Sequence, residues 1–510
     1  MLMNNRSIQL LLVAFCGLFL VGCGGSDTPE QEIPPAVIVE PIISQFSFLT
    51  ENNPSLSLNL NLSISGNTIT GNFPVEADWQ GMIATIEHTG ASLVVNDAAQ
   101  TSAVSMQDFR DVKTYTVIME DGRQVSYAVD VVAFTGLPVI YLTTSGNNPI
   151  DSKEDYFDGT VTIKGGRDFE DVSSAIMKIR GRGNSTWFFH PKKAFQMKLD
   201  DKSTFLDMPS KKKWLFLAEY SDKTMLRNTI SFEMGYLSNL EWTPKSSFAE
   251  VYINDEYNGT YNITEKVEEG SNRVNIGDEG FLLEIDQLDR QDPDDVYFHT
   301  DEFLVAIKEP NLDWDDEQFN YIKGHINAFE ATLFASNFAD PINGYAKYID
   351  VDSFVDWYLI SEITKNVDSR SFSSIYFNLV PGEKIKMGPL WDFDLSFGNV
   401  DYADSRYSQG YWVKDNPWFA KLFTDSVFVE KVKTRFAYFK ANQNLILDKI
   451  DAYADKLNLA QQENDLKWGT LGTYVWPNPL VFDTYSEEVT HLKTWYSQRM
   501  NWLDDALNNL

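Results

Sequence analysis

Two hydrophobic periodicities divide this chain of 510 residues, and the change between them limits the folds that it can adopt. Up to about residue 310, apolar and polar side chains alternate in short runs such as SLSLNLNLSISGNTITG (55–71), which is typical of half-buried β-strands. From about residue 313, apolar residues recur at helical spacing, as in SFVDWYLISEITKNV (353–367). We therefore expect a multidomain protein in which strands precede helices, since the length allows two or three domains.

The first 23 residues have the pattern of a bacterial lipoprotein signal. Arg6 gives a positive start, IQLLLVAFCGLFLVG (8–22) is too short for a comfortable membrane span, and LVGC ends the run at Cys23. We expect lipidation of Cys23; the alternative is an ordinary signal peptide that happens to contain a cysteine. Residues 24–43 read as a linker, and Gly24 gives no inner-membrane retention signal. The expected location is the outer membrane or the cell surface, with the lipid as the only membrane contact.

The cysteine count and the charge exclude several functions. Cys16 would leave with the signal, so disulfides, cysteine-ligated zinc and thiol catalysis are ruled out for the mature chain. The net charge of -32 argues against sequence-independent binding to nucleic acid or anionic lipid, both of which need a basic surface. A small basic pocket for a phosphorylated ligand stays possible.

Two domains are expected after the linker. Residues 44–136 read as a small all-β sandwich with hairpin turns at Gly66-Asn67 and Asp121-Gly122, and this segment resembles immunoglobulin-like modules that precede catalytic domains. We interpret it as a spacer or a weak binding module. Residues 137–510 read as one α+β domain, which includes an internal hairpin in SSIYFNLVPGEKIKMGPLWDFD (373–394).

Two aspartates stand inside an apolar run in GPLWDFDLSFGN (388–399). Burying Asp392 and Asp394 without partners would cost several kcal/mol or raise their pKa. Asp368 lies on the other side of the internal hairpin, so it can converge with Asp392 on one point. Mg²⁺ takes hard oxygen ligands, commonly one or two carboxylates plus phosphate oxygens, and its charge would make the burial tolerable.

Basic residues gather in KIRGRGNSTWFFHPKKAFQMKL (178–199). Arg180 precedes a glycine-containing turn whose N–H groups could approach an anion, and Lys193 and Lys198 could reach phosphate oxygens. The alternative is a hairpin with a solvated basic face.

Two further stretches contain candidate partners of phosphate or lysine. In KKKWLFLAEYSDKTMLRNTISFEMG (211–235), Arg227 could pair with a carboxylate or a phosphate, and a helix cap with a salt bridge is the plainer alternative. In EVYINDEYNGTYNITEKVEEG (250–270), Asn258-Gly259 predicts the hairpin turn. Glu265 is either a partner for a lysine or an ordinary exposed charge.

These stretches, together with NVDS, WDFDLSFG and WYSQRMNWL, resemble in this order the CotH kinase family, named for the spore-coat protein H kinase. The resemblance spans about 137–505. It implies an atypical, extracytoplasmic protein-kinase-like fold that binds ATP and Mg²⁺ or Mn²⁺ and transfers phosphate to Ser or other hydroxyls of secreted or surface proteins.

The resemblance also implies roles by position. Asp392 would be a metal ligand, Asp394 a second ligand or its neighbour, and Asp368 the catalytic base. The phosphates would be held by Lys193 or Lys198, with Glu265 orienting that lysine, and Arg180 and Arg227 would be secondary contacts. The chain has neither an HRD motif nor a full G-x-G-x-x-G loop, so the phosphate contacts are assigned by position alone.

Two other functions stay open. ATP is scarce outside the cytoplasm, so the domain could be a catalytically weak or inactive kinase-like binding or assembly protein at the cell surface, in a polysaccharide-associated complex for example. A metal-dependent hydrolase using the same aspartates is the third possibility. The acceptor, the function of the β module and the oligomeric state are not indicated.

Overall fold

A computed structural model describes residues 40–510 apart from 57–58, 75–77 and 166–167. The expected signal, Cys23 and residues 24–39 of the linker lie outside the described residues, so lipidation stays a prediction. The described residues form two compact units, one of residues 40–71 with 78–131, the other of residues 72–74 with 132–510. None of the helices in the described ranges is long and apolar enough to cross a membrane.

The first unit is β-rich, as expected. Its strands form a three-stranded sheet (β2-β1-β6), a six-stranded sheet (β3-β4-β11-β10-β7-β8) and a β5-β9 pair. Both predicted hairpin turns are confirmed, since Ser65 pairs with Thr68 and Ile118 with Gln124. The strands are β1 (Ile43–Phe48), β2 (Leu60–Asn61), β3 (Ser63–Ser65), β4 (Thr68–Pro74), β5 (Met82–Ile83), β6 (Thr85–His88), β7 (Ser92–Val95), β8 (Ala98–Gln100), β9 (Met106–Gln107), β10 (Lys113–Ile118) and β11 (Gln124–Phe134).

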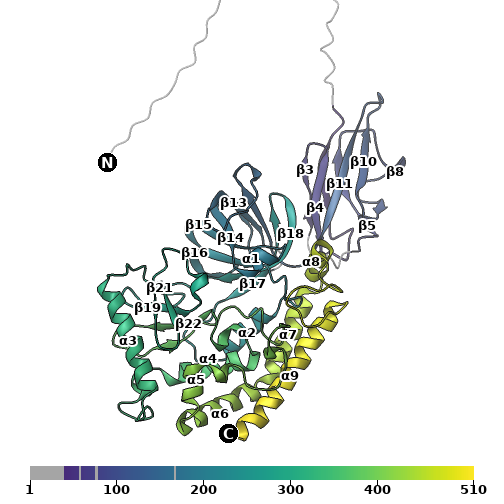
Figure 1. The fold of residues 1–510 in the computed structure, drawn as a ribbon. Helices are drawn as coiled ribbons and strands as arrows, with labels where there is room; N and C mark the ends of the chain where they lie inside the picture. The colour runs from purple at the N-terminus through teal and green to yellow at the C-terminus, as the bar shows by residue number, and fades with distance from the viewer. Residues whose placement is uncertain (1–39, 57–58, 75–77, 166–167) are drawn as a thin grey trace, which may run out of the picture. The chain divides into compact units, whose positions relative to one another are not determined.

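The second unit begins with a closed barrel that the periodicity did not predict (Figure 1). A parallel β12–β17 pairing closes it, and its inward-facing side chains, such as Met177, Met197 and Trp214, fill the interior. The barrel is therefore a packed core and not a pore. In barrel order its strands are β12 (Val139–Thr144), β13 (Phe157–Lys164), β14 (Val172–Arg182), β15 (Ala194–Phe205), β16 (Met208–Leu217), β18 (Glu256–Glu265) and β17 (Ser246–Ile253).

The expected hairpin turn at Asn258-Gly259 is wrong. The β17–β18 turn lies at Asn254 and Asp255, which both adopt positive φ (51° and 67°), as the favoured two-residue hairpin turn requires. Gly259 lies inside β18 opposite Val251, next to a register shift. A larger residue would not fit at this position, because a Cβ there would lie 2.6 Å from Asn464 Oδ1.

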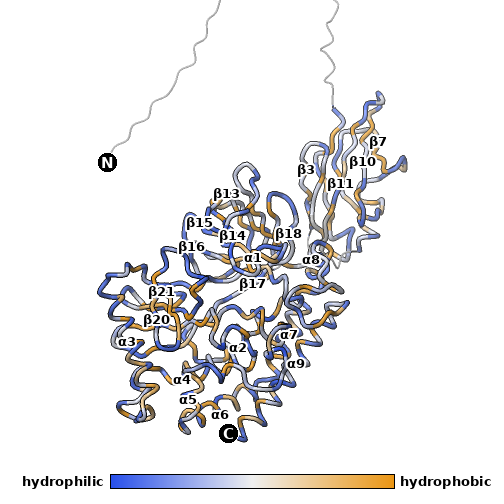
Figure 2. Tube along the Cα trace, in the orientation of Figure 1, coloured by the Kyte–Doolittle hydropathy of each residue, from blue (hydrophilic) through white to orange (hydrophobic). Residues whose placement is uncertain are grey.

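A five-stranded sheet follows the barrel and carries the internal hairpin that the sequence predicted. Its order is β20 (Tyr297–His299), β21 (Leu304–Glu309), β19 (Phe281–Ile285), β22 (Ile375–Leu379) and β23 (Lys386–Met387). The hairpin is β22–β23, in which Phe377 pairs with Met387. Figure 2 shows hydrophobic residues recurring along β20, β21 and helices α4 to α6, whereas many connecting turns are hydrophilic.

Helices dominate the rest of the second unit, as expected. Every residue of α4 from Ser353 to its end at Thr364 is buried. This helix is therefore packed on all sides, and it fixes the position of the segment that follows it. The α-helices are α1 (Ser185–Phe189), α2 (Arg227–Tyr236), α3 (Glu317–Leu333), α4 (Val351–Thr364), α5 (Pro417–Leu422), α6 (Ser426–Ala441), α7 (Gln443–Leu457), α8 (Ala460–Trp468) and α9 (Tyr485–Asn508). Short 3₁₀ turns are η1 (Ser145–Asn147), η2 (Leu288–Arg290), η3 (Tyr345–Lys347), η4 (Asp368–Arg370), η5 (Asp404–Arg406) and η6 (Val413–Asp415).

Candidate functional site

The three aspartates singled out in the sequence line one cavity of about 300 Å³ in the second unit. Asp368 begins η4, which is separated from the end of α4 by residues 365–367, whereas Asp392 and Asp394 follow β23. The end of β14, the N-terminal part of α1, the end of β16 and strands β19, β21 and β22 also contribute to the wall. The cavity therefore lies where the barrel, the five-stranded sheet and the end of α4 meet.

The aromatic residues around the two aspartates hold the turn in the core. Trp391, Phe393 and Phe397 are buried. The Trp391 ring stacks on the Phe232 ring, with 6.5 Å between the ring centroids. Phe393 and Phe397 do not line the cavity, whereas Asp392 and Asp394 do, next to one side of Trp391.

Two consecutive serines hold carboxylates of the site. The Ser373 hydroxyl donates to Asp368 Oδ2 at 3.4 Å and accepts from Arg290 Nη1, while the Ser374 hydroxyl donates to Asp392 Oδ2 at 3.2 Å. The start of the internal hairpin therefore contacts both the predicted catalytic base, Asp368, and the predicted metal ligand, Asp392.

Carboxylates outnumber cations around the cavity. Burial, together with the charge of Asp392, raises the pKa of Asp368 to about 7. Burial and the charge of Asp392 also raise the pKa of Asp394 well above its ordinary value. The cavity-lining carboxylates are Glu219, Glu284, Asp286, Asp368, Asp392 and Asp394, and the cations are Lys153, Arg182, Arg290 and Lys308. Such a site favours either protons or an added cation.

The donor set fits a divalent cation that arrives with a nucleotide. Among the described residues, no three His, Cys, Asp or Glu side chains are grouped as a ready-made metal site. Mg²⁺ in nucleotide sites usually takes only one or two carboxylates and completes its shell with phosphate oxygens and water. Asp392 and Asp394 can provide that pair of carboxylates.

The glycine-containing turn predicted to approach an anion also lines the cavity, through Gly183, Asn184, Ser185 and Thr186. Gly183 has φ +90°, and a Cβ there would lie 2.3 Å from the Thr186 hydroxyl, so the tight turn requires glycine.

The structure does not bring the predicted lysines or Arg180 to this cavity. Lys193 Nζ donates to the carbonyls of Trp187 and His190, at 2.6 Å each, and lines a different cavity. Lys198 is exposed on the barrel, opposite Lys178 in the ladder. The Arg180 guanidinium lies over the Tyr156 ring, 4.9 Å from its centroid. Their side chains are engaged or solvated away from the aspartates.

Arg227 and Glu265 are buried in ion pairs and do not line the cavity. Arg227 pairs with Asp222, and its Nε donates to the carbonyl of Ser396 at 3.1 Å, so it braces the turn after Asp394. Glu265 pairs with Arg273 and accepts the N–H of Lys245 at 2.8 Å. Glu265 therefore has an arginine partner in place of the expected lysine.

Other cations take the cavity positions. The Arg182 guanidinium lies 5.5 Å from the centre of the Trp391 ring, next to the turn of Asp392. Lys308 Nζ, on β21, lies 3.5 Å from Glu284 Oε2, on β19. The sequence signal for the Lys308–Glu284 pair is that FLLEID (281–286) and LVAIKE (304–309) contain charges inside apolar strands, as WDFD does.

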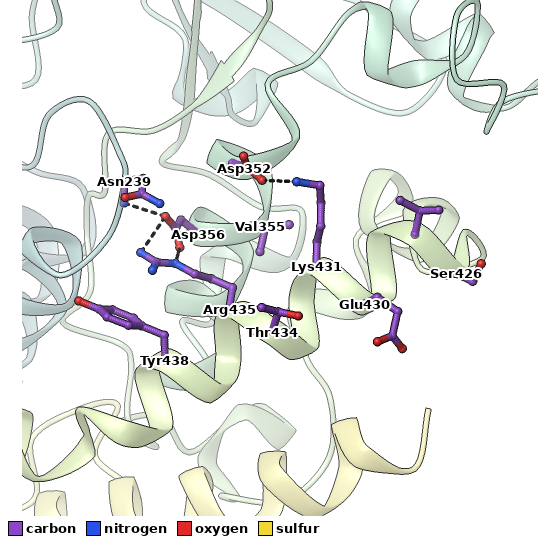
Figure 3. A pocket seen from close by; sticks show the side chains of 11 residues that line it. Asn239, Asp352, Val355, Asp356, Ser426, Glu430, Lys431, Thr434, Arg435 and Tyr438 are labelled. Atoms are coloured by element: carbon purple, nitrogen blue, oxygen red, sulfur yellow. Dashed lines mark hydrogen bonds and ion pairs between the residues drawn. The ribbon is translucent and has the colours of Figure 1, made fainter.

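Figure 3 shows a larger cavity, of about 680 Å³, between α4 and α6. Asp352 accepts from Lys431 Nζ at 2.7 Å, and Asp356 accepts from Arg435 Nε at 2.5 Å. Its main acidic and basic groups thus neutralise each other in pairs. We therefore place the candidate functional site in the smaller cavity, where carboxylates are in excess.

The fold and the cavity define a mixed α/β protein whose cavity is lined by more carboxylates than cations. The chain belongs to the CotH kinase protein family, whose profile matches residues 179–503, more than half of the sequence. The resemblance inferred from the sequence motifs is thereby confirmed.

Two of the solved structures that match show only weak likeness, and the curated proteins gave no match. One, a candidate secreted protein from Bacteroides fragilis, is 14% identical, with a TM-score of 0.13, over 18% of this chain and 94% of that chain. The other, a candidate glycoside hydrolase from Bacteroides thetaiotaomicron, is 14% identical, with a TM-score of 0.17, over 58% of this chain and 89% of that chain. These TM-scores are too low to carry an argument about fold or function.

Proposed function

We propose that the second unit is an atypical kinase that transfers the γ-phosphate of ATP, with Mg²⁺ or Mn²⁺, to hydroxyls of secreted or surface proteins. The observation that carries this proposal is the convergence of Asp368, Asp392 and Asp394 on one cavity. Membership of the CotH kinase family supports the same reaction class.

Asp368 would act as the general base in this reaction. Its carboxylate accepts the proton of the acceptor hydroxyl while the hydroxyl oxygen forms a bond to the γ-phosphorus and the bond to the β-phosphate oxygen breaks, which releases ADP. A pKa of about 7 suits a base that works near neutral pH. The hydrogen bond from Ser373 orients its Oδ2.

Asp392 and Asp394 would hold the divalent cation. When bound, the cation would offset charge on the phosphate oxygens and on the buried carboxylates. The Ser374 hydroxyl fixes one oxygen of Asp392, so the other oxygen is available for the cation.

Arg182, Lys308 and the Gly183 turn are the proposed phosphate contacts. They line the cavity that contains the aspartates, whereas Lys193 and Lys198 do not. Phosphoryl transfer depends mainly on positioning and charge neutralisation, so these groups would suffice without a glycine-rich kinase loop.

The rest of the chain would place this domain outside the cell. We propose that the first unit is an immunoglobulin-like spacer and that lipid on Cys23 anchors the chain at the outer membrane or cell surface. Membrane association that persists after Cys23→Ser would contradict the anchor without touching the kinase proposal.

The test of the proposed function is phosphate transfer from γ-labelled ATP, with Mg²⁺ or Mn²⁺, to the chain itself and to a serine-rich model protein. Asp368→Asn and Asp392→Asn should lose transfer, whereas Asp352→Asn, an exposed carboxylate of α4 paired with Lys431, should keep it. Equal transfer by all variants would contradict the assignment. A wild-type chain that neither transfers phosphate nor gains thermal stability from ATP and metal would favour the binding or assembly function.

A further inference from the structure

The peptide bond between Asp392 and Phe393 is held from both sides by asparagine side chains. Asn366 Nδ2 donates to the carbonyl oxygen of Asp392 at 3.0 Å, and the N–H of Phe393 donates to Asn228 Oδ1 at 2.7 Å. Both asparagines are almost fully buried, with 1% and 3% of their surface exposed. Because buried donors and acceptors are costly to leave unpaired, this peptide plane is confined to one orientation.

Asp392 needs such support because its backbone is in the left-handed region, with φ 64°. This region is unfavourable for residues other than glycine, and it persists only where surrounding contacts impose it. Here the strained residue is the proposed metal ligand. The direction of its carboxylate therefore depends on the bonds that fix its backbone.

Each asparagine also makes a bond to a second cavity residue. Asn366 Oδ1 accepts the N–H of Asp368 at 3.4 Å, so one carboxamide joins the proposed base to the proposed metal ligand. Asn228 Nδ2 donates to the carboxylate of Glu219, at 3.1 and 3.2 Å to its two oxygens. The two side chains thus connect three cavity residues, through the backbones of Asp368 and Asp392 and the carboxylate of Glu219.

We propose that Asn366 and Asn228 are positioning residues that orient the Asp392 carboxylate and thereby set the affinity of the cavity for a divalent cation. The inference rests on the proposed function. Both asparagines act through the backbone of Asp392 and Phe393, because their amide groups are already bonded to the protein. Partners that orient metal ligands typically change metal affinity by 10- to 100-fold when removed.

The experiment measures Mn²⁺ binding to the full chain in the presence of ATP by calorimetry, with the melting temperature of each variant recorded. Asn366→Leu and Asn228→Leu keep the side-chain size and remove the bonds, so the Mn²⁺ Kd should rise at least about tenfold. Asn416→Ala is the matched control. Asn416 is also buried and accepts a backbone N–H, that of Trp418 at 3.0 Å, but it caps α5 outside the cavity. Its Kd should stay within about twofold of wild type.

A reciprocal exchange separates positioning from general destabilisation. Asn228→Asp keeps an oxygen for the Phe393 N–H but sets a carboxylate against Glu219, so Mn²⁺ binding should weaken. Adding Glu219→Gln again places one carboxamide against one carboxylate, with the carboxylate now at residue 228 and the carboxamide at residue 219. The double variant should then bind Mn²⁺ within about threefold of Glu219→Gln alone, since the bond to Phe393 is kept.

The outcomes distinguish this proposal from the proposed function. Folded leucine variants that bind Mn²⁺ as wild type does would overturn the positioning role while leaving the kinase proposal intact. If the leucine variants do not fold, the exchange pair decides, and a folded double variant without recovery overturns the role. A wild-type chain that binds no Mn²⁺ with ATP would contradict both proposals, whereas binding without phosphate transfer would contradict the kinase proposal alone.

Discussion

Asn366 connects the two sides of the internal hairpin by donating to the carbonyl of Asp392 at 3.0 Å while it accepts the N–H of Asp368 at 3.4 Å. The residue follows α4, whose buried C-terminal turn fixes its position. The backbones of two aspartates that are 24 positions apart in the sequence are therefore bonded to one side chain. The two aspartates are therefore connected through their backbones by Asn366, in addition to lining the same cavity.

Asp368 and Asp392 should fail in different ways when they are neutralised. Asp368→Asn removes the base and should lower kcat by about 10²- to 10⁴-fold with a small change in Mn²⁺-ATP affinity. Asp392→Asn removes a metal ligand and should raise the metal concentration needed for half-maximal rate. Steady-state kinetics at varied Mn²⁺ and ATP separates the two. Identical losses in the same parameter would contradict this division of roles.

Arg182 should matter for nucleotide binding, whereas the lysines favoured by the sequence should not. Arg182→Met removes a cavity guanidinium, and a lost charge-assisted contact should raise the KM for ATP by about tenfold or more. Lys193→Met and Lys198→Met change residues outside the cavity, so they serve as controls with unchanged KM. A larger effect at either lysine than at Arg182 would restore the position-based assignment.

Neutralising Asp368 should stabilise the metal-free protein in an alkaline buffer. Burial and the charge of Asp392 raise its pKa to about 7 from 3.8, so between these values the folded state binds more protons than the unfolded state. The contribution of Asp368 to stability is therefore present at low pH and is lost as the pH rises through 7. Asp368→Asn should raise the melting temperature relative to wild type at pH 8 and hardly at pH 4. The opposite order would contradict the raised pKa.

The Glu265–Arg273 pair should affect stability and not phosphate binding. Both side chains are buried, and Arg273→Met leaves the carboxylate without its partner, which should lower the free energy of unfolding by about 3 kcal/mol. Denaturant titration measures the loss, and the KM for ATP of the folded variant should stay as in wild type. A raised KM with unchanged stability would return Glu265 to the nucleotide site.

The sequence was informative where charged residues interrupt an apolar run. Charges inside the apolar run WDFD located Asp392 and Asp394, and the hairpin between Asp368 and Asp392 was recognisable from its turn and its strands. The turn residues Gly66-Asn67 and Asp121-Gly122 also located both hairpin turns of the first unit.

Other features depend on contacts that no local pattern contains. Closure of the barrel requires β12 to pair with β17 across a long stretch of chain, and the Asn258-Gly259 turn signal was overridden by Asn254-Asp255. Arg180 and Arg182 stand on the same strand and look equivalent, yet only Arg182, at the strand end, lines the cavity. The position of each arginine relative to the end of β14 therefore determines which one lines the cavity.

The most direct test of the account is the position of Mn²⁺ in crystals grown with a non-hydrolysable ATP analogue, located by anomalous diffraction. We predict a Mn²⁺ peak bonded to the carboxylate of Asp392 and to phosphate oxygens of the analogue, in the cavity that Asp368 and Asp394 also line. Mn²⁺ and nucleotide bound elsewhere, for example in the cavity of Figure 3, or Mn²⁺ without contact to Asp392, would contradict the central claim.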